Sequence, residues 1–216
     1  NSSEKFIFGE NYDYKKKAKG FIYKDKLGKI NLPPPNLLGD FQISNVSTAI
    51  AVARNLDQFK ITEQHIKEAI TKIRSEGRLQ SITQGKLRKC VSKNNQILVD
   101  GAHNPLAASV VNKYLKTLNT GRKIFMILGM MENKEHKKFI QIFKDNVYSI
   151  ITLDIPNQTN SIEKGKLSKI AQSCGISSKT ENSIEEAMRN IANENSSAII
   201  FCTGSLYFAG EILNLN

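Results

Sequence analysis

The chain has 216 residues, of which 40% are hydrophobic and 24% are charged, fractions that are ordinary for a soluble globular protein. No stretch approaches the ~18 apolar residues that a membrane span needs, and residues 1–8 lack the pattern of a signal peptide. We therefore expect a cytoplasmic protein without a membrane partner. Three scattered histidines and three cysteines without CxxC spacing predict no metal site.

The formal net charge of +11 raises the question of an anionic partner. A basic chain can bind nucleic acid through phosphate contacts. However, seven lysines gather in the turn-rich stretch 15–29 without interleaved aromatic residues of a known module, and the others alternate with Asp, Glu and Asn. We expect a solvated surface that favours small anionic substrates, and no nucleic-acid partner.

The first third of the chain is predicted to form short strands and then two helices. Glycines separate the strands, and three consecutive prolines after them end any regular element. Apolar residues spaced three and four apart predict the helices. The predicted strands cover residues 5–8, 20–23 and 29–32, and the predicted helices cover residues 42–56 and 62–73.

After Arg78 strands and helices alternate, which is typical of parallel βαβ units. The predicted strands cover residues 96–99, 123–128, 147–153 and 198–202. The predicted helices cover residues 105–118, 134–143, 161–172, 183–191 and 205–213. We expect two parts: residues 1–80, too small to bury a core alone and therefore preceded by more chain, and an α/β, Rossmann-like domain over 81–216 with a mainly parallel sheet flanked by helices.

The segment at residues 98–105 combines a strand end, a tight turn and a helix start. Asn104 is a favourable N-cap and Pro105 suits the first helical position, so both have a purely structural explanation. Asp100 and His103 do not. At the carboxyl end of a parallel strand they would face the crevice where open α/β sheets bind ligands, beside a helix N-terminus that favours anions.

Five segments in order resemble the folylpolyglutamate synthase and dihydrofolate synthase family, which is related to the Mur ligases. Asp-Gly-Ala-His-Asn-Pro is the most specific of them, and Leu-Gly-Asp-Phe-Gln-Ile-Ser-Asn and Glu-Gly-Arg-Leu-Gln precede it. The five segments cover residues 38–45, 76–80, 100–105, 129–135 and 203–207. The departures from the family pattern are Phe41 in place of a histidine, Ser75 and Glu76 in place of Trp and Pro, and Glu135 in place of Asp. Phe41 removes any polar role at that position.

The resemblance implies a C-terminal domain of the Mur ligase type, preceded by the tail of a central ATPase domain. It implies ATP contacts for Asn45, Arg78 and Asp100. It places His103, Ser205 and Lys134 on the glutamate side, with His103 assisting the incoming amine as a catalytic base. Ser205 could equally be a helix N-cap, and Lys134 an ordinary surface lysine.

The implied reaction is ATP-dependent addition of L-glutamate to folate or dihydropteroate through an acyl phosphate, with Mg²⁺ on the phosphates. The chain contains no G-x-x-x-x-G-K-[ST] phosphate loop. We therefore expect the phosphate loop and the Mg²⁺ ligands upstream, an inactive isolated chain, and a monomeric complete enzyme. Two alternatives remain open: a Mur-type amino-acid ligase, and a basic, non-catalytic nucleic-acid-binding domain.

Overall fold

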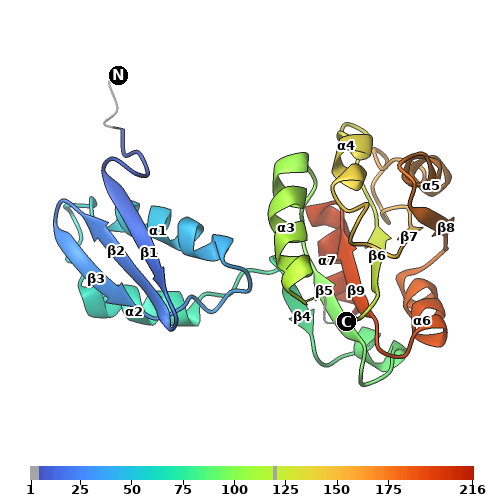
Figure 1. Ribbon diagram of the computed structural model, residues 1–216, viewed down its shortest axis with the longest axis horizontal. Helices are drawn as coiled ribbons and strands as arrows, with labels where there is room; N and C mark the ends of the chain where they lie inside the picture. Colours follow the sequence, from blue (N-terminus) through green and yellow to red (C-terminus); the bar gives the residue numbers. More distant parts are fainter. Residues whose placement is uncertain (1–4, 119–120) are drawn as a thin grey trace. The chain divides into compact units, whose positions relative to one another are not determined.

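The structure is a computed structural model that describes residues 5–118 and 121–216. The chain divides into two compact units, one ending at Ser75 and one from Glu76 to Asn216 (Figure 1). The sequence had suggested a division after residue 80, so residues 76–80 belong with the second unit. None of the described helices is both long and apolar enough to cross a membrane.

The first unit is a three-stranded antiparallel sheet with two helices on one face (Figure 1). Its strands are β1 (Tyr12–Lys17), β2 (Gly20–Asp25) and β3 (Gly28–Leu32), in that order across the sheet, and its helices are α1 (Phe41–Ala53) and α2 (Glu63–Lys72). Phe21 and Tyr23 are buried against the helices, whereas Lys24 is exposed, as expected when only one face of a sheet is covered. The predictions of both helices and of β2 and β3 are confirmed. The expectation that residues 1–80 are too small to bury a core alone is wrong, because buried side chains from the sheet and both helices form a core within this unit.

The predicted strand over residues 5–8 is wrong, and β1 replaces it. Phe8 forms only an isolated bridge to Tyr12. The sequence pattern does not indicate β1, because four of its six residues are charged. Tyr12 is buried and Tyr14 half-buried, while Asp13 and Lys15 are exposed, so β1 does alternate. Its apolar positions are tyrosines, which makes the alternation weak in sequence.

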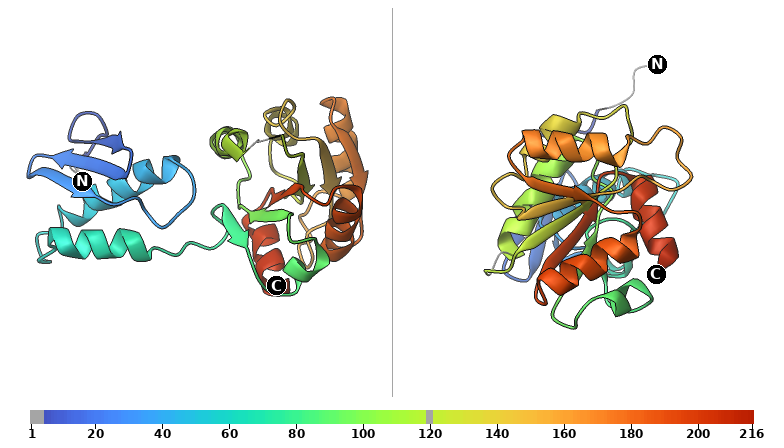
Figure 2. Two further views of the ribbon diagram at one scale, coloured as in Figure 1. Left: turned by 60° about the horizontal axis from the view of Figure 1, so that its bottom comes forward. Right: turned by 90° about the vertical axis from the view of Figure 1, so that its right-hand side faces the viewer.

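The second unit is a six-stranded sheet with helices on both faces (Figure 2). The strand order is β4–β5–β9–β6–β7–β8, and every pairing is parallel except that of β4 with β5. The strands are β4 (Gln80–Ile82), β5 (Gln96–Val99), β6 (Ile124–Leu128), β7 (Ser149–Thr152), β8 (Ser177–Thr180) and β9 (Ile199–Thr203). The helices are α3 (Pro105–Leu118), α4 (His136–Gln141), α5 (Lys164–Ser173), α6 (Ile184–Glu194), α7 (Leu206–Leu215) and the short 3-10 helix η1 (Leu87–Cys90).

The centre of this sheet is buried on both faces. Every residue of β6 and β9 is buried, which explains their continuous apolar sequences. Phe201 of β9 packs against Phe143, 6.1 Å between ring centroids, on the face covered by α3, α4 and α5. The α6 and α7 side chains pack on the other face with Ile97 and Cys202. The predicted α/β, mainly parallel fold is confirmed.

The strands missed by the sequence, β4 and β8, are the two edges of the sheet. β8 reads Ser-Ser-Lys-Thr and is largely exposed, so it has no apolar pattern. Its strand conformation comes from parallel pairing with β7, not from its own side chains. Edge strands of this kind cannot be predicted from their own sequence, because their conformation depends on pairing with the neighbouring strand.

Candidate functional site

Three strand ends meet at the carboxyl edge of the parallel sheet. Gly204, after β9, donates its N–H to the carbonyl of Ala102, after β5, at 3.0 Å. Gly129, after β6, donates to the carbonyl of Thr203 at 3.2 Å. Gly204 has a φ of +116°, and a Cβ there would lie 2.5 Å from the Gly129 carbonyl oxygen, so only glycine fits. These bonds bring three of the family-like segments together.

Asp100 is the buried charge at this edge, with only 4% of its surface exposed. Its Oδ2 accepts from the N–H of Leu79 at 2.8 Å, and its Oδ1 accepts from the N–H of Ala102 at 2.8 Å. Burial raises the pKa of the Asp100 carboxyl above its ordinary value of 3.8, and the two backbone N–H groups act in the opposite direction. The carboxylate therefore ties the segment around Leu79 to the end of β5.

Arg78 is held beside this carboxylate by its backbone. Gly101 donates its N–H to the Gly77 carbonyl at 2.8 Å, and Leu79 adopts a φ of +48°, unusual for a residue with a side chain. A Cβ on Gly101 would lie 3.2 Å from Nη1 of Arg78 and 2.2 Å from a methyl of Leu206. Arg78 is exposed and forms no ion pair with the described residues. Its guanidinium is available to an anion.

A single cavity of about 280 Å³ is lined by His103, Lys134 and Ser205, the three residues that the family resemblance places on the glutamate side. His103 Nδ1 lies 2.9 Å from the Gly101 carbonyl oxygen. Because a carbonyl only accepts, Nδ1 carries the proton, and Nε2 of the neutral ring is left as an acceptor. Lys134 is half-buried at the same cavity and forms no ion pair with a described residue.

Ser205 caps the N-terminus of α7. Its Oγ accepts from the N–H of Tyr207 at 3.1 Å, and the residue is only 3% exposed. The structural alternative for Ser205 is therefore confirmed. The hydroxyl proton has no acceptor among the described residues, so the same group can also donate to a ligand.

Asn45 lies in the first unit, exposed on α1. Its Nδ2 donates to Oε1 of Gln42 at 2.9 Å. Gln42 is 2% exposed, and its Nε2 has no partner among the described residues. A buried amide with an unpaired donor is unusual in a folded protein, and this marks Gln42 as a candidate site residue that the sequence had not assigned.

Four further residues of the 280 Å³ cavity were also not assigned from the sequence: Met131, Asn133, Leu206 and Tyr207. Met131 and Asn133 lie in the loop that follows β6, whereas Leu206 and Tyr207 are the first two residues of α7, directly after the turn that follows β9. Their position in the chain is the signal that could have identified them, because the segments that follow neighbouring parallel strands lie at the same edge of the sheet. Residue type alone gave no reason to select them.

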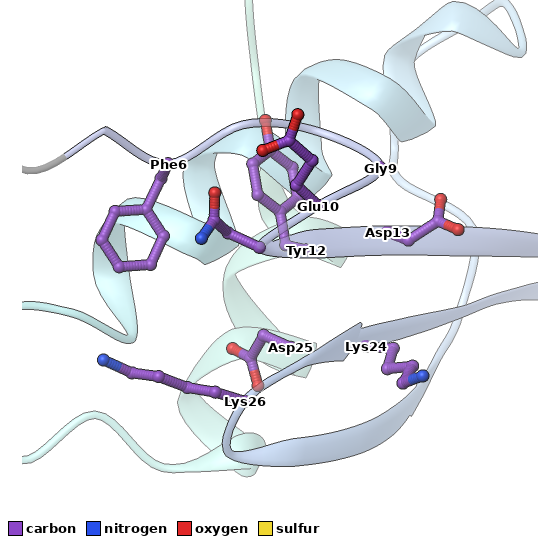
Figure 3. Close-up of a pocket in the computed structure, with 9 residues that line it drawn as sticks. Phe6, Gly9, Glu10, Tyr12, Asp13, Lys24, Asp25 and Lys26 are labelled. Atoms are coloured by element: carbon purple, nitrogen blue, oxygen red, sulfur yellow. The ribbon is translucent and has the colours of Figure 1, made fainter.

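A larger hollow, about 430 Å³, lies in the first unit and is lined by none of the predicted site residues (Figure 3). Asp25 lines it, but its carboxylate is already occupied. Arg54 donates to it through Nε at 2.7 Å and Nη2 at 3.1 Å, and the Tyr23 hydroxyl donates at 3.2 Å. Burial, and then the Asp25 charge, raise the pKa of Tyr23. This network is part of the folded core, and we assign no ligand to it.

Comparisons with known proteins agree with the geometry. The family described as "Dihydrofolate synthetase, C-terminal domain" matches residues 81–215. The chain belongs to this family. Folylpolyglutamate synthase of Lacticaseibacillus casei is 24% identical over 195 residues, 89% of this chain and 42% of the relative. UDP-N-acetylmuramyl-tripeptide synthetase of Borreliella afzelii is 30% identical over 145 residues, 62% of this chain and 27% of that protein. The chain therefore spans less than half the length of either relative.

Solved structures share the fold. The bifunctional folylpolyglutamate synthase/dihydrofolate synthase of Yersinia pestis, complexed with AMPPNP and Mn, superimposes with a TM-score of 0.79 at 16% identity. The match covers 97% of this chain and 46% of that one. A structure of such an enzyme with Mn, AMPPNP and L-glutamate bound gives a TM-score of 0.78 at 17% identity. At these identities the likeness establishes the fold alone.

Proposed function

We propose that this chain is the C-terminal part of an ATP-dependent ligase that adds L-glutamate to folate or dihydropteroate. The observation that carries the proposal is the 280 Å³ cavity lined by His103, Lys134 and Ser205, next to Arg78 and the buried Asp100, in a member of this family. Cationic and hydroxyl donors around one acceptor nitrogen suit an amino acid that presents carboxylates and must lose a proton.

The proposed reaction uses ATP to convert the acceptor carboxylate into an acyl phosphate. The glutamate amine then attacks the acyl carbon, phosphate leaves, and the amine proton passes to Nε2 of His103. Ser205 and Lys134 would hold the glutamate carboxylates, and Arg78 the phosphate oxygens. Asp100 would act mainly as a positioning residue, because both its oxygens already accept backbone N–H groups.

The first unit would be the tail of the ATP-binding domain, with Asn45 and Gln42 toward the nucleotide. Mg²⁺ would offset the phosphate charge. Among the described residues no three His, Cys, Asp or Glu side chains lie together as a metal site. We therefore propose that Mg²⁺ is held by phosphates and by groups outside this chain, in a cytoplasmic enzyme that is monomeric when complete.

The test is replacement of His103 by Ala in the complete enzyme. If His103 takes the proton, kcat falls by ~10²–10⁴-fold. His65→Gln is the control, because His65 lies at the start of α2 in the other unit and should leave kcat and the glutamate KM unchanged. Unaltered kcat and KM in His103→Ala contradict the assignment.

A Mur-type ligase with another acceptor is the second candidate, favoured by the similarity to the Borreliella afzelii synthetase. The two differ in the acceptor and not in the chemistry. Phosphate release by the complete enzyme should require folate or dihydropteroate together with glutamate. Release with a UDP-muramyl peptide instead supports the second candidate.

A further inference from the structure

A second polar hollow in the Glu76–Asn216 unit lies where β4 ends and β5 begins, at the opposite end of β5 from His103. Its volume is about 320 Å³. Three cationic side chains line it, Arg88, Lys93 and Arg122, and no aspartate or glutamate is among its lining residues. Three positive charges around one hollow repel one another unless an anion or solvent ions compensate them.

Arg122 is fixed in place by neutral acceptors. Its Nε donates to the Ser197 carbonyl at 2.9 Å, and its Nη2 donates to the carbonyls of Asn94 at 2.8 Å and Ala198 at 3.1 Å. Its Nη1 reaches the side-chain oxygen of Gln96 at 3.4 Å. The guanidinium is therefore rigidly held, yet no carboxylate among the described residues neutralises its charge.

Arg88 is held in a similar way but keeps free donors. Its Nη1 donates to the Ser92 carbonyl at 2.9 Å and to the Val91 carbonyl at 3.4 Å. Its Nε and Nη2 have no acceptor among the described residues. Because the side chain is already ordered, little conformational entropy is lost when these donors meet a ligand. Lys93 is exposed and adds an ammonium group without an ion pair in the described part of the chain.

The remaining lining fits the same chemistry. Ser81 and Thr83 contribute hydroxyls that bond to no described residue, and only Ile82 and Ile97 are apolar. An oxyanion with several acceptor oxygens satisfies such a set of donors, whereas an apolar ligand does not. The volume of the hollow is on the scale of a small molecule.

We propose that this hollow is a second anion site, which binds the phosphate group of a small molecule through Arg88, Lys93 and Arg122. The site is separate from the proposed ligase cavity and does not depend on that function. It gives part of the unusual positive charge of the chain a defined ligand.

The test is a titration of the ¹⁵N-labelled chain with inorganic phosphate, in NMR spectra at constant ionic strength and without ATP or glutamate. We expect shifts of the amides at residues 81–83 and 93–96. The double variant R88Q/K93Q should weaken phosphate binding at least about tenfold, since it removes charge-assisted hydrogen bonds. Lys93→Gln alone, which breaks no hydrogen bond of the described fold, should weaken it by about threefold or more.

The matched control is K116Q/R189Q, which removes the same charge from exposed positions on α3 and α6. It should leave the phosphate affinity within about twofold. Three results overturn the proposal: no shift at residues 81–83 and 93–96, an equal loss of affinity in the control, or an oligonucleotide that shifts the same amides at lower concentration than phosphate does.

Discussion

The two sheets of this protein differ in how many of their faces are covered by helices. In the first unit the helices cover one face of an antiparallel sheet, and the other face exposes Lys15, Lys24 and Lys29 around the half-buried Ile22. In the second unit helices cover both faces, and every residue of β6 and β9 is buried. The strands of the second sheet can therefore be predicted from continuous apolar runs. Prediction of the first sheet depends on alternation of apolar and polar residues, and this pattern is weak because lysines and tyrosines occupy many of its positions.

The units also bury their carboxylates differently. Asp25 receives a two-bonded contact from Arg54, so its charge is neutralised inside the first unit. Asp100 receives only two backbone N–H groups, and burial raises its pKa. A buried acid that is neutralised within the fold contributes to the core, whereas a buried acid without a contacting cation is a feature that recurs at functional sites.

The largest expected effect is a difference in stability loss between substitutions of apolar residues in the two sheets. Phe201→Ala removes a fully buried ring that packs on Phe143, and we expect the free energy of unfolding of the second unit to fall by ~3–5 kcal/mol. Ile22→Ala, on the uncovered face of the first sheet, should cost less than about 1 kcal/mol. Urea denaturation followed by NMR peak intensities in each unit measures both. Equal losses contradict the comparison.

The next effect concerns the ion pair inside the first unit. Arg54→Ala leaves the Asp25 carboxylate buried without its cation and should destabilise the first unit by about 3 kcal/mol. Lys67→Ala is the control, because it removes an exposed helical pair with Glu63 and should cost less than about 0.5 kcal/mol. The same denaturation experiment measures both losses in the free energy of unfolding. A loss for Arg54→Ala that is no larger than that for Lys67→Ala contradicts the stabilising role of the Arg54–Asp25 ion pair.

A smaller, pH-dependent effect is expected at Asp100. Its folded pKa lies above the ordinary value of 3.8, so the folded state binds more protons than the unfolded state in the interval above 3.8. In that window the contribution of Asp100 to stability is largest at low pH and decreases as pH rises through the folded pKa. Relative to Asp100→Asn, the wild type should therefore gain stability as pH falls from 7 toward 4.

Urea denaturation of wild type and Asp100→Asn at several pH values measures this difference. The Asn side chain keeps the size of the carboxyl group but does not titrate, which isolates the contribution of the proton. A difference that is constant with pH, or that moves in favour of the variant at low pH, contradicts the raised pKa.

The smallest effect tests a loop of the second unit. Asn157 has a φ of +57° and is exposed, a conformation in which glycine has no steric cost. Asn157→Gly should change stability by less than about 0.5 kcal/mol, whereas Asn157→Ala should destabilise by about 1 kcal/mol. Thermal unfolding of the two variants compares them directly. Alanine and glycine variants of equal stability contradict this reading of the loop.

The sequence anticipated much of the candidate site in the second unit. The strand-to-helix turn at residues 100–105 formed as expected, with Asn104 accepting from the N–H of Ala107 at 2.9 Å. His103, Lys134 and Ser205 line one cavity. What the sequence could not supply was the bonding of Asp100, because its partners, the N–H groups of Leu79 and Ala102, are backbone groups without a side-chain signature.

The sequence by itself determined the central strands, the amphipathic helices and the α/β class, because apolar periodicity predicts them. It also determined the family, because short motifs carry that resemblance. Only the tertiary structure decided the edge strands β4 and β8, the true first strand β1, and the cationic hollow of Arg88, Lys93 and Arg122. The physical reason is that edge pairing and charge clustering depend on neighbours distant in the chain. Local residue patterns do not predict which distant residues become neighbours in the fold.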